Sequence, residues 1–154
     1  MLLANTTKRV EPLVLYSSSV ELSVPSVEVY PFVSDLQKYA EWMPLIHSVV
    51  PTGEDSWDVE LRAKVGLLAR SKRLSMRRVS NSAELIVFER DESDGRSHSP
   101  WTLTVRTTPS DHGCVVTMEM AYGGTLWTAG ILDRVLASQV EAGKAGLARV
   151  VHGA

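Results

Sequence analysis

The stretch WTLTVRTTPSDHGCVVTMEMAY, residues 101–122, decides the fold class of this chain. Apolar and polar residues alternate in it twice, once on each side of a turn signal at 110–113, which is typical of two antiparallel strands with one buried face. The residues expected to face the core and a C-terminal helix are Trp101, Leu103, Met118 and Met120, and those expected to face away are Thr102, Thr104, Thr117 and Glu119.

The same two-residue period recurs through the chain before this stretch. Residues 57–65 alternate without an error and form the clearest strand. Further strands are predicted at 14–24, 46–50, 70–79 and 84–89, separated by short turns. This spacing indicates an antiparallel meander of about seven strands.

Helical periodicity appears in two places. Residues 26–43 fit two short helices better than one long helix, because Pro31 removes a backbone hydrogen bond from the first of them. Ser26 and Asp35 are placed to cap these helices. From Leu126 the apolar residues follow a helical period for about 25 residues. The order of a strand, two short helices, about six strands and a long helix predicts an α+β domain.

Length and composition exclude several classes of protein. The 154 residues have room for one domain, which we expect at 12–154 after a flexible lead-in at 1–11. A net charge of −2 argues against a basic DNA-binding protein. The single cysteine, Cys114, excludes internal disulfides, and no run of about 18 apolar residues predicts a membrane span. Together these features predict a cytoplasmic protein with no transmembrane segment.

The long helix is the only element that could cover the apolar face of such a sheet. One helix does not fill a large, curled sheet, so we expect a cavity between them. Its walls are expected to be rich in Trp and Met, and flexible methionine side chains can adapt to a ligand of irregular shape. The residues expected to bind a ligand are Tyr16, Trp42, Trp57, Leu61, Trp101, Leu103, Met118, Met120, Tyr122, Leu132, Leu136 and Gly143.

Gly143 lies on the apolar stripe of the long helix, where glycine costs about 1 kcal/mol relative to alanine. Close packing against a bulky side chain would explain it. Space left for a ligand in the middle of the cavity would explain it equally well, and the sequence leaves both interpretations open.

Residues 25–50, PSVEVYPFVSDLQKYAEWMPLIHSVV, resemble the opening of the START-like, polyketide cyclase/dehydrase and lipid-transport superfamily (SRPBCC). The positions that carry the resemblance are Pro25, Tyr30, Asp35 and the turn Trp42-Met43-Pro44. Residues 101–122, with a strand that begins at Trp and one that ends in Tyr-Gly-Gly, are similar to the coenzyme-Q-binding-protein branch. The resemblance implies a helix-grip fold of the birch-pollen-allergen type with a hydrophobic ligand cavity, but it implies no particular reaction.

No motif for metal, cofactor or nucleophilic chemistry is visible. The four histidines, at 47, 98, 112 and 152, have no spacing that would place two of them on one metal, so we expect neither metal nor cofactor. Cys114 occupies a position of the strand pattern that is expected to be buried, so we interpret it as a small hydrophobic core residue. The residues that would best serve acid–base chemistry are Tyr16, His47, Arg106 and Tyr122. For His47 the favoured interpretation is a side chain that lies on the outer face or is bonded to a carbonyl.

Seven cations lie close together on neighbouring predicted strands. Such a run could contact anionic lipid headgroups or RNA, although a solvated outer face is the favoured interpretation because acidic residues follow at 91–94. The seven are Arg62, Lys64, Arg70, Lys72, Arg73, Arg77 and Arg78.

Three functions follow from these features. The first is a binding protein for a small hydrophobic ligand such as a lipid, a polyketide or an isoprenoid quinone. The second is an enzyme of the polyketide cyclase, aromatase or dehydratase type, which needs little more than shape and one base. The third is a protein- or RNA-interaction module that uses the basic strands. The first is favoured by the family resemblance and by the absence of any convergent acid–base or metal motif.

Overall fold

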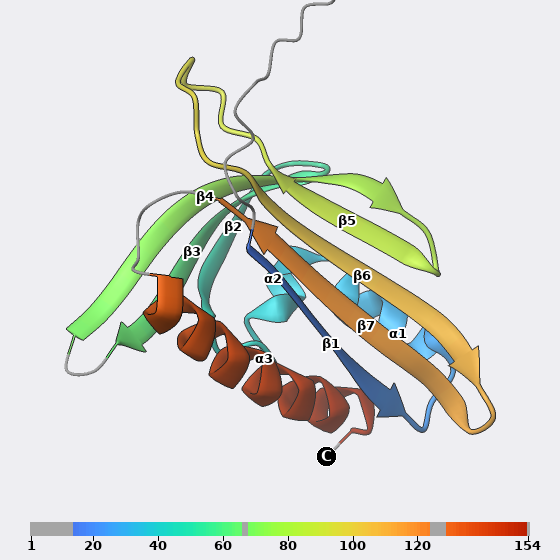
Figure 1. The fold of residues 1–154 in the computed structure, drawn as a ribbon. Helices are drawn as coiled ribbons and strands as arrows, with labels where there is room; N and C mark the ends of the chain where they lie inside the picture. Colours follow the sequence, from blue (N-terminus) through green and yellow to red (C-terminus); the bar gives the residue numbers. More distant parts are fainter. Residues whose placement is uncertain (1–13, 66–67, 124–128, 154) are drawn as a thin grey trace, which may run out of the picture.

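A computed structural model of the chain describes residues 14–65, 68–123 and 129–153. Within these residues, seven strands form one antiparallel sheet in the order β1-β7-β6-β5-β4-β3-β2 (Figure 1). The strands are β1 (Val14–Leu22), β2 (Ile46–Gly53), β3 (Ser56–Val65), β4 (Leu68–Asn81), β5 (Leu85–Arg90), β6 (Trp101–Ser110) and β7 (Gly113–Tyr122). The helices are α1 (Ser26–Val33), α2 (Leu36–Tyr39) and α3 (Ala129–Val151).

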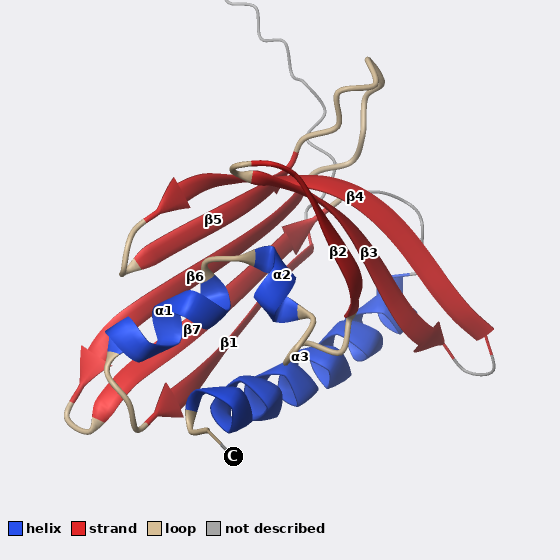
Figure 2. Ribbon diagram, turned by 180° about the vertical axis from the view of Figure 1, so that it is seen from behind, coloured by secondary structure: helices blue, strands red, loops and turns tan. Residues whose placement is uncertain are grey.

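The sheet wraps around α3. This helix contacts β1, at one edge of the sheet, and β3, next to the other edge, so the sheet must curl until both ends reach the same helix (Figure 2). The short helices α1 and α2 cover the concave side beside it. The arrangement confirms the α+β helix-grip fold predicted from the sequence. No helix in the described residues is long and apolar enough to cross a membrane. The predicted lead-in at 1–11 lies outside the described residues.

The two short helices begin differently from each other. Asp35 caps α2 as predicted, because its carboxylate accepts a hydrogen bond of 2.9 Å from the Gln37 backbone N–H. The expectation that Ser26 caps α1 is wrong: Pro25 occupies the N-cap position, and no side chain caps the helix. Pro31 lies inside α1, which is only 8 residues long.

The strand β2 is longer than the sequence indicated. It was expected to end before Pro51, but it continues to Gly53, with Pro51 opposite Trp57 of β3. Proline lacks the N–H that an inner strand needs, and β2 tolerates it because it lies at an edge of the sheet.

Alternate burial along β7 confirms the predicted register. Every second residue from Cys114 to Tyr122 is buried, including Met118 and Met120. Glu119 faces the other side, where its carboxylate lies 3.6 Å from the Arg106 side chain. The concave side of the sheet therefore carries the core, and Glu119 and Arg106 lie on its convex side.

Candidate functional site

The concave face of the sheet encloses a small apolar pocket. Its volume is about 40 Å³. Thr102, which was expected to face away from the core, is the only described lining residue with a hydroxyl or charged side chain. The lining residues are Leu36, Met43, Leu45, Ile46, Val59, Leu61, Leu74, Met76, Trp101, Thr102, Leu103 and Met120.

Four of the predicted ligand-binding residues line this pocket, namely Leu61, Trp101, Leu103 and Met120. Two further predicted residues lie next to these four. The ring of Tyr122 stacks on that of Trp101 with a centroid distance of 5.1 Å. Tyr16 is half-buried and lies opposite Met120 in the pairing of β1 with β7, which places both on the concave face.

The other predicted aromatic residues lie elsewhere in the core. The Trp42 indole N–H donates to the carbonyl of Phe32 at 3.0 Å. The Trp57 ring meets Phe88 edge-on at 5.7 Å. Neither Trp42 nor Trp57 lines the pocket, nor does the buried Met118, so a ligand contact for these three residues stays a prediction.

Gly143 packs against the segment that follows α2. A Cβ atom at this position would lie 3.8 Å from the Trp42 ring and 3.8 Å from the Met43 side chain, which is ordinary van der Waals contact. Gly143 does not itself line the pocket, but Met43 does. The side chains of Leu132 and Leu136, which were also expected to bind a ligand, lie outside the description.

Several pocket residues were not predicted from the sequence. Leu74 and Met76 lie at alternate positions of β4, so the two-residue period of that strand carried the signal. The second short helix was expected to reach Met43, but α2 ends at Tyr39, so Met43 lies four residues beyond it and outside any helix or strand. Only the packing of that turn against the sheet and α3 places it in the pocket wall.

The four predicted acid–base residues separate onto two faces. His47 is exposed, as the outer-face interpretation expected, and Arg106 is exposed beside Glu119 on the convex face. Tyr16 and Tyr122 share the concave face. In the described chain, no group of three or more His, Cys, Asp or Glu side chains is arranged to hold a metal ion.

Two other titratable groups are buried in the core. Tyr39 donates its hydroxyl hydrogen to the carbonyl of Val33 at 2.7 Å, and burial raises the pKa of the phenol. Burial also raises the pKa of the Cys114 thiol, and the side chain has no exposed surface. Both residues therefore have the environment of core side chains.

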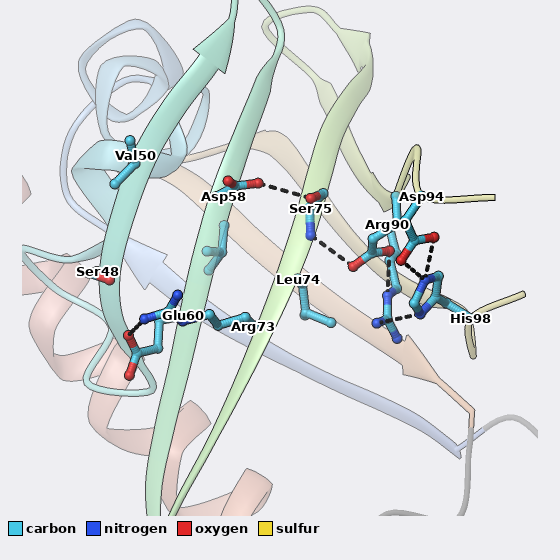
Figure 3. A pocket seen from close by; sticks show the side chains of 12 residues that line it. Ser48, Val50, Asp58, Glu60, Arg73, Leu74, Ser75, Arg90, Asp94 and His98 are labelled. Atoms are coloured by element: carbon cyan, nitrogen blue, oxygen red, sulfur yellow. Dashed lines mark hydrogen bonds and ion pairs between the residues drawn. The ribbon is translucent and has the colours of Figure 1, made fainter. Parts of the chain in front are cut away.

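A larger hollow of about 480 Å³ lies over the other side of β2, β3 and β4 (Figure 3). Its polar groups bind one another. The Ser75 hydroxyl donates to Asp58 at 2.9 Å, and His98 contacts Asp94 at 2.9 Å. Because these groups are mutually satisfied, the hollow is less suited to an apolar guest than the pocket on the concave face.

Arg90 and Glu92 form a nearly buried ion pair at the border of this hollow. Their side chains are 8% and 13% exposed, and Arg90 Nε lies 2.7 Å from a Glu92 oxygen. The other Glu92 oxygen accepts a 3.0 Å bond from the Ser75 backbone N–H. Burial alone would raise the pKa of Glu92, but the bonds from Arg90 and Ser75 outweigh it, so this pKa is lowered. The pair joins the end of β5 to β4.

The seven clustered cations do not form one surface. Arg62 and Arg73 contact Glu60, and Arg77 contacts Asp91, on the convex side. Lys72 lies opposite Leu61 in the register of β3 and β4, on the concave side.

Arg78 also lies on the concave side, where its guanidinium is 5.6 Å from the centre of the Trp57 ring. Lys64 is exposed, and the side chain of Arg70 lies outside the description. The favoured interpretation of these cations as one solvated outer face is therefore wrong for Lys72 and Arg78, because successive residues of a strand face opposite ways.

Comparison with solved structures finds the same fold in several proteins. A START superfamily protein from Mycobacterium smegmatis has a TM-score of 0.72 and 12% identity, over 90% of this chain and 97% of that one. The Zhui aromatase/cyclase from Streptomyces sp. R1128 has a TM-score of 0.69 and 14% identity, over 92% and 94%. The di-domain ARO/CYC StfQ from the steffimycin biosynthetic pathway has a TM-score of 0.64 and 16% identity, over 90% and 50%.

At these identities the likeness shows the fold alone. No curated protein sequence matches the chain. The family model described as polyketide cyclase/dehydrase and lipid transport matches residues 14–152, which include all the described strands and the three described helices. A closer relation to the coenzyme-Q-binding branch stays a prediction. The extent of the family match shows that the chain belongs to the polyketide cyclase/dehydrase and lipid transport family.

Proposed function

We propose that the protein binds a small, mainly apolar molecule between the concave face of the sheet and α3 and carries out no chemistry on it. The observation that carries this proposal is the composition of the pocket, whose described lining is apolar except for Thr102. Family membership is compatible with hydrophobic ligand binding and with a cyclase role. A lipid, a polyketide and an isoprenoid quinone all have the required apolar body.

The size of the pocket sets a condition on ligand binding. A volume of about 40 Å³ holds a few water molecules at most and not a lipid. At roughly 24 cal/mol per Å³, an empty space of this size costs about 1 kcal/mol, so the fold tolerates it without a ligand. A ligand must therefore displace side chains of the wall. Met43, Met76 and Met120 are suited to this, because an unbranched methionine changes rotamer easily.

An enzymatic role of the cyclase, aromatase or dehydratase type is the second candidate, because family membership is compatible with it. Of the four predicted acid–base residues, only Tyr16 and Tyr122 lie on the pocket side of the sheet. Catalysis at this pocket would therefore use one of these phenols. If Tyr16→Phe and Tyr122→Phe each leave the turnover of an accepted polyketide unchanged, this alternative is removed.

Binding of an anionic surface or of RNA through the basic residues of β3 and β4 is a weaker candidate function. Arg62, Arg73 and Arg77 already contact carboxylates, which reduces the charge available to a partner. Retention of RNA at low salt that is lost in Arg77→Glu with Arg78→Glu would support it, and no retention at low salt would contradict it.

The binding proposal is tested with an uncharged apolar dye such as Nile red and two matched variants of β6. Leu103→Trp fills the pocket, whereas Thr104→Trp adds the same side chain to the opposite face of the strand. We expect the wild type and Thr104→Trp to bind the dye and Leu103→Trp to lose most of the affinity. Circular dichroism checks that both variants fold, because overpacking costs roughly 1–3 kcal/mol.

Native mass spectrometry of gently purified protein provides a second, independent measurement. A co-purified hydrophobic molecule would support the proposal. Failure of the wild type to bind the dye, together with a spectrum that shows only the bare chain, would contradict it. Equal dye binding by Leu103→Trp and the wild type would contradict the placement of the site in this pocket.

A further inference from the structure

We infer that the ligand carries an anionic group, a carboxylate or a phosphate ester, and that the ammonium group of Lys72 binds it at the border of the apolar pocket. This inference rests on the proposed function, since it specifies the chemistry of a molecule held in the same pocket. It predicts an amphipathic ligand with an apolar body and one charged end.

The position of Lys72 follows from the pairing of β3 with β4. Lys72 lies directly opposite Leu61, and Leu74 lies directly opposite Val59, with no register shift along the two strands. Directly opposed residues of an antiparallel pair project to the same face, as do residues two apart in one strand. Leu61, Leu74 and Val59 all line the pocket. Lys72 therefore projects from the sheet on the pocket side, beside these three residues.

The pairing of β4 with β5 ends before it reaches Lys72. The last paired residues are Met76 and Arg90, and beyond them Ser75 bonds to the Asp91 backbone N–H and to the Glu92 carboxylate. From Leu74 back to Leu68, none of the described strands pairs with this side of β4. Lys72 thus lies at the border between the covered core and the surface, which agrees with its half-buried side chain.

Lys72 has no direct partner for its charge within the described part of the chain. Its amine makes neither an ion pair nor a hydrogen bond there. The nearby arginines differ in this respect: Arg73 contacts Glu60, Arg78 contacts Asp55 and Arg90 contacts Glu92.

Burial and the charge of Arg90 lower the pKa of Lys72, while Glu92 acts in the opposite sense. The Glu92 carboxylate is already bonded to Arg90 and to the Ser75 backbone. An ammonium group that is partly removed from water and has no partner is less stable than a paired one, and a ligand anion would supply a charge-assisted hydrogen bond.

The inference is tested by calorimetry with three ligands that share one apolar chain, namely dodecanoate, dodecyl phosphate and dodecanol. We expect the wild type to bind the two anions about tenfold more tightly than the alcohol, the difference typical of one hydrogen bond to a charged group. Lys72→Met keeps an apolar stem but removes the charge. It should lose this preference while its affinity for dodecanol stays unchanged.

Two control variants and two control ligands sharpen the test. Lys64→Met removes an exposed charge from the convex side of β3 and should keep the preference, and Lys72→Arg should restore it. Acetate and inorganic phosphate test whether the cation binds free anions. We expect them to bind far more weakly than the dodecyl ligands, because they lack the apolar body.

Each outcome bears on a different claim. Equal wild-type affinities for the anions and for dodecanol, or a preference that survives in Lys72→Met, would overturn the inference and leave the proposed function standing. Inorganic phosphate that binds as tightly as dodecyl phosphate would also overturn it, because the site would then recognise a free anion. Failure of dodecanol, the anions and Nile red alike to bind would contradict the proposed function and the inference together.

Discussion

Gly146 of α3 packs directly against the main chain of Trp42. A Cβ atom at position 146 would overlap the carbonyl oxygen of Trp42. Three residues earlier in the helix, Gly143 faces the side chains of Trp42 and Met43 at an ordinary distance of 3.8 Å. The two glycines therefore differ: Gly146 allows the close approach of the helix to the turn after α2, and Gly143 has room for a methyl group.

This difference predicts opposite effects of alanine at the two positions. Gly146→Ala should lower the free energy of unfolding by about 2 kcal/mol or more, because a main-chain oxygen cannot rotate away from the added methyl group. Gly143→Ala should raise it by about 0.5–1 kcal/mol through helix propensity. Urea unfolding of both variants measures the two changes. A Gly146→Ala protein as stable as the wild type would contradict the close contact.

A larger side chain at Gly143 distinguishes its two interpretations. Trp42 and Met43 occupy the space in front of it, so Gly143→Leu should overpack and lower stability by roughly 1–3 kcal/mol, with the affinity for Nile red little changed. Thermal unfolding and dye titration measure both properties. Unchanged stability with weaker dye binding would instead support a ligand position at Gly143.

The Arg90–Glu92 pair predicts a pH-dependent contribution to stability. The pKa of Glu92 is lowered in the folded protein from its ordinary value of 4.5, so its ionised form favours folding. The contribution is fully present above pH 4.5 and is lost as the pH falls through the lower folded pKa.

Glu92→Gln should therefore lower the free energy of unfolding at pH 7 by about 1–2 kcal/mol and have little effect in strong acid. Unfolding in urea across the acid range measures the difference between variant and wild type. The exposed Glu89, which lies in β5 three residues before Glu92, provides the control variant Glu89→Gln. A Glu92→Gln difference that is independent of pH would show that charge is not the cause.

Arg78 predicts a local effect on the short helices. Its guanidinium donates to the carbonyl of Ser34, between α1 and α2, at 2.6 Å and to Asp55 at 2.6 Å. Lysine cannot make both bonds with the same geometry, so Arg78→Lys should lower stability by roughly 1–3 kcal/mol. Hydrogen exchange should accelerate at residues 35–39 more than in β7. Uniform acceleration over the whole chain would contradict a local role.

The positions of most strands and helices could be predicted from local sequence. A strand with one buried face must alternate, and the alternation from Cys114 to Tyr122 determined which side chains of β7 reach the core. Asp35 marked the start of α2 because a carboxylate can accept a backbone N–H there. Four pocket residues, Leu61, Trp101, Leu103 and Met120, followed from the same alternation.

Contacts between distant segments were decided only by the tertiary structure. The cations from Arg62 to Arg78 form one run in the sequence, yet the pairing of β3 with β4 places Lys72 on the pocket side and Arg73 on the other. The packing of the curled sheet against the helices determines where the pairing of β4 with β5 ends. It also determines how closely Gly146 approaches Trp42. The local sequence period does not predict this packing, because the packing depends on the volumes of side chains from segments far apart in the chain.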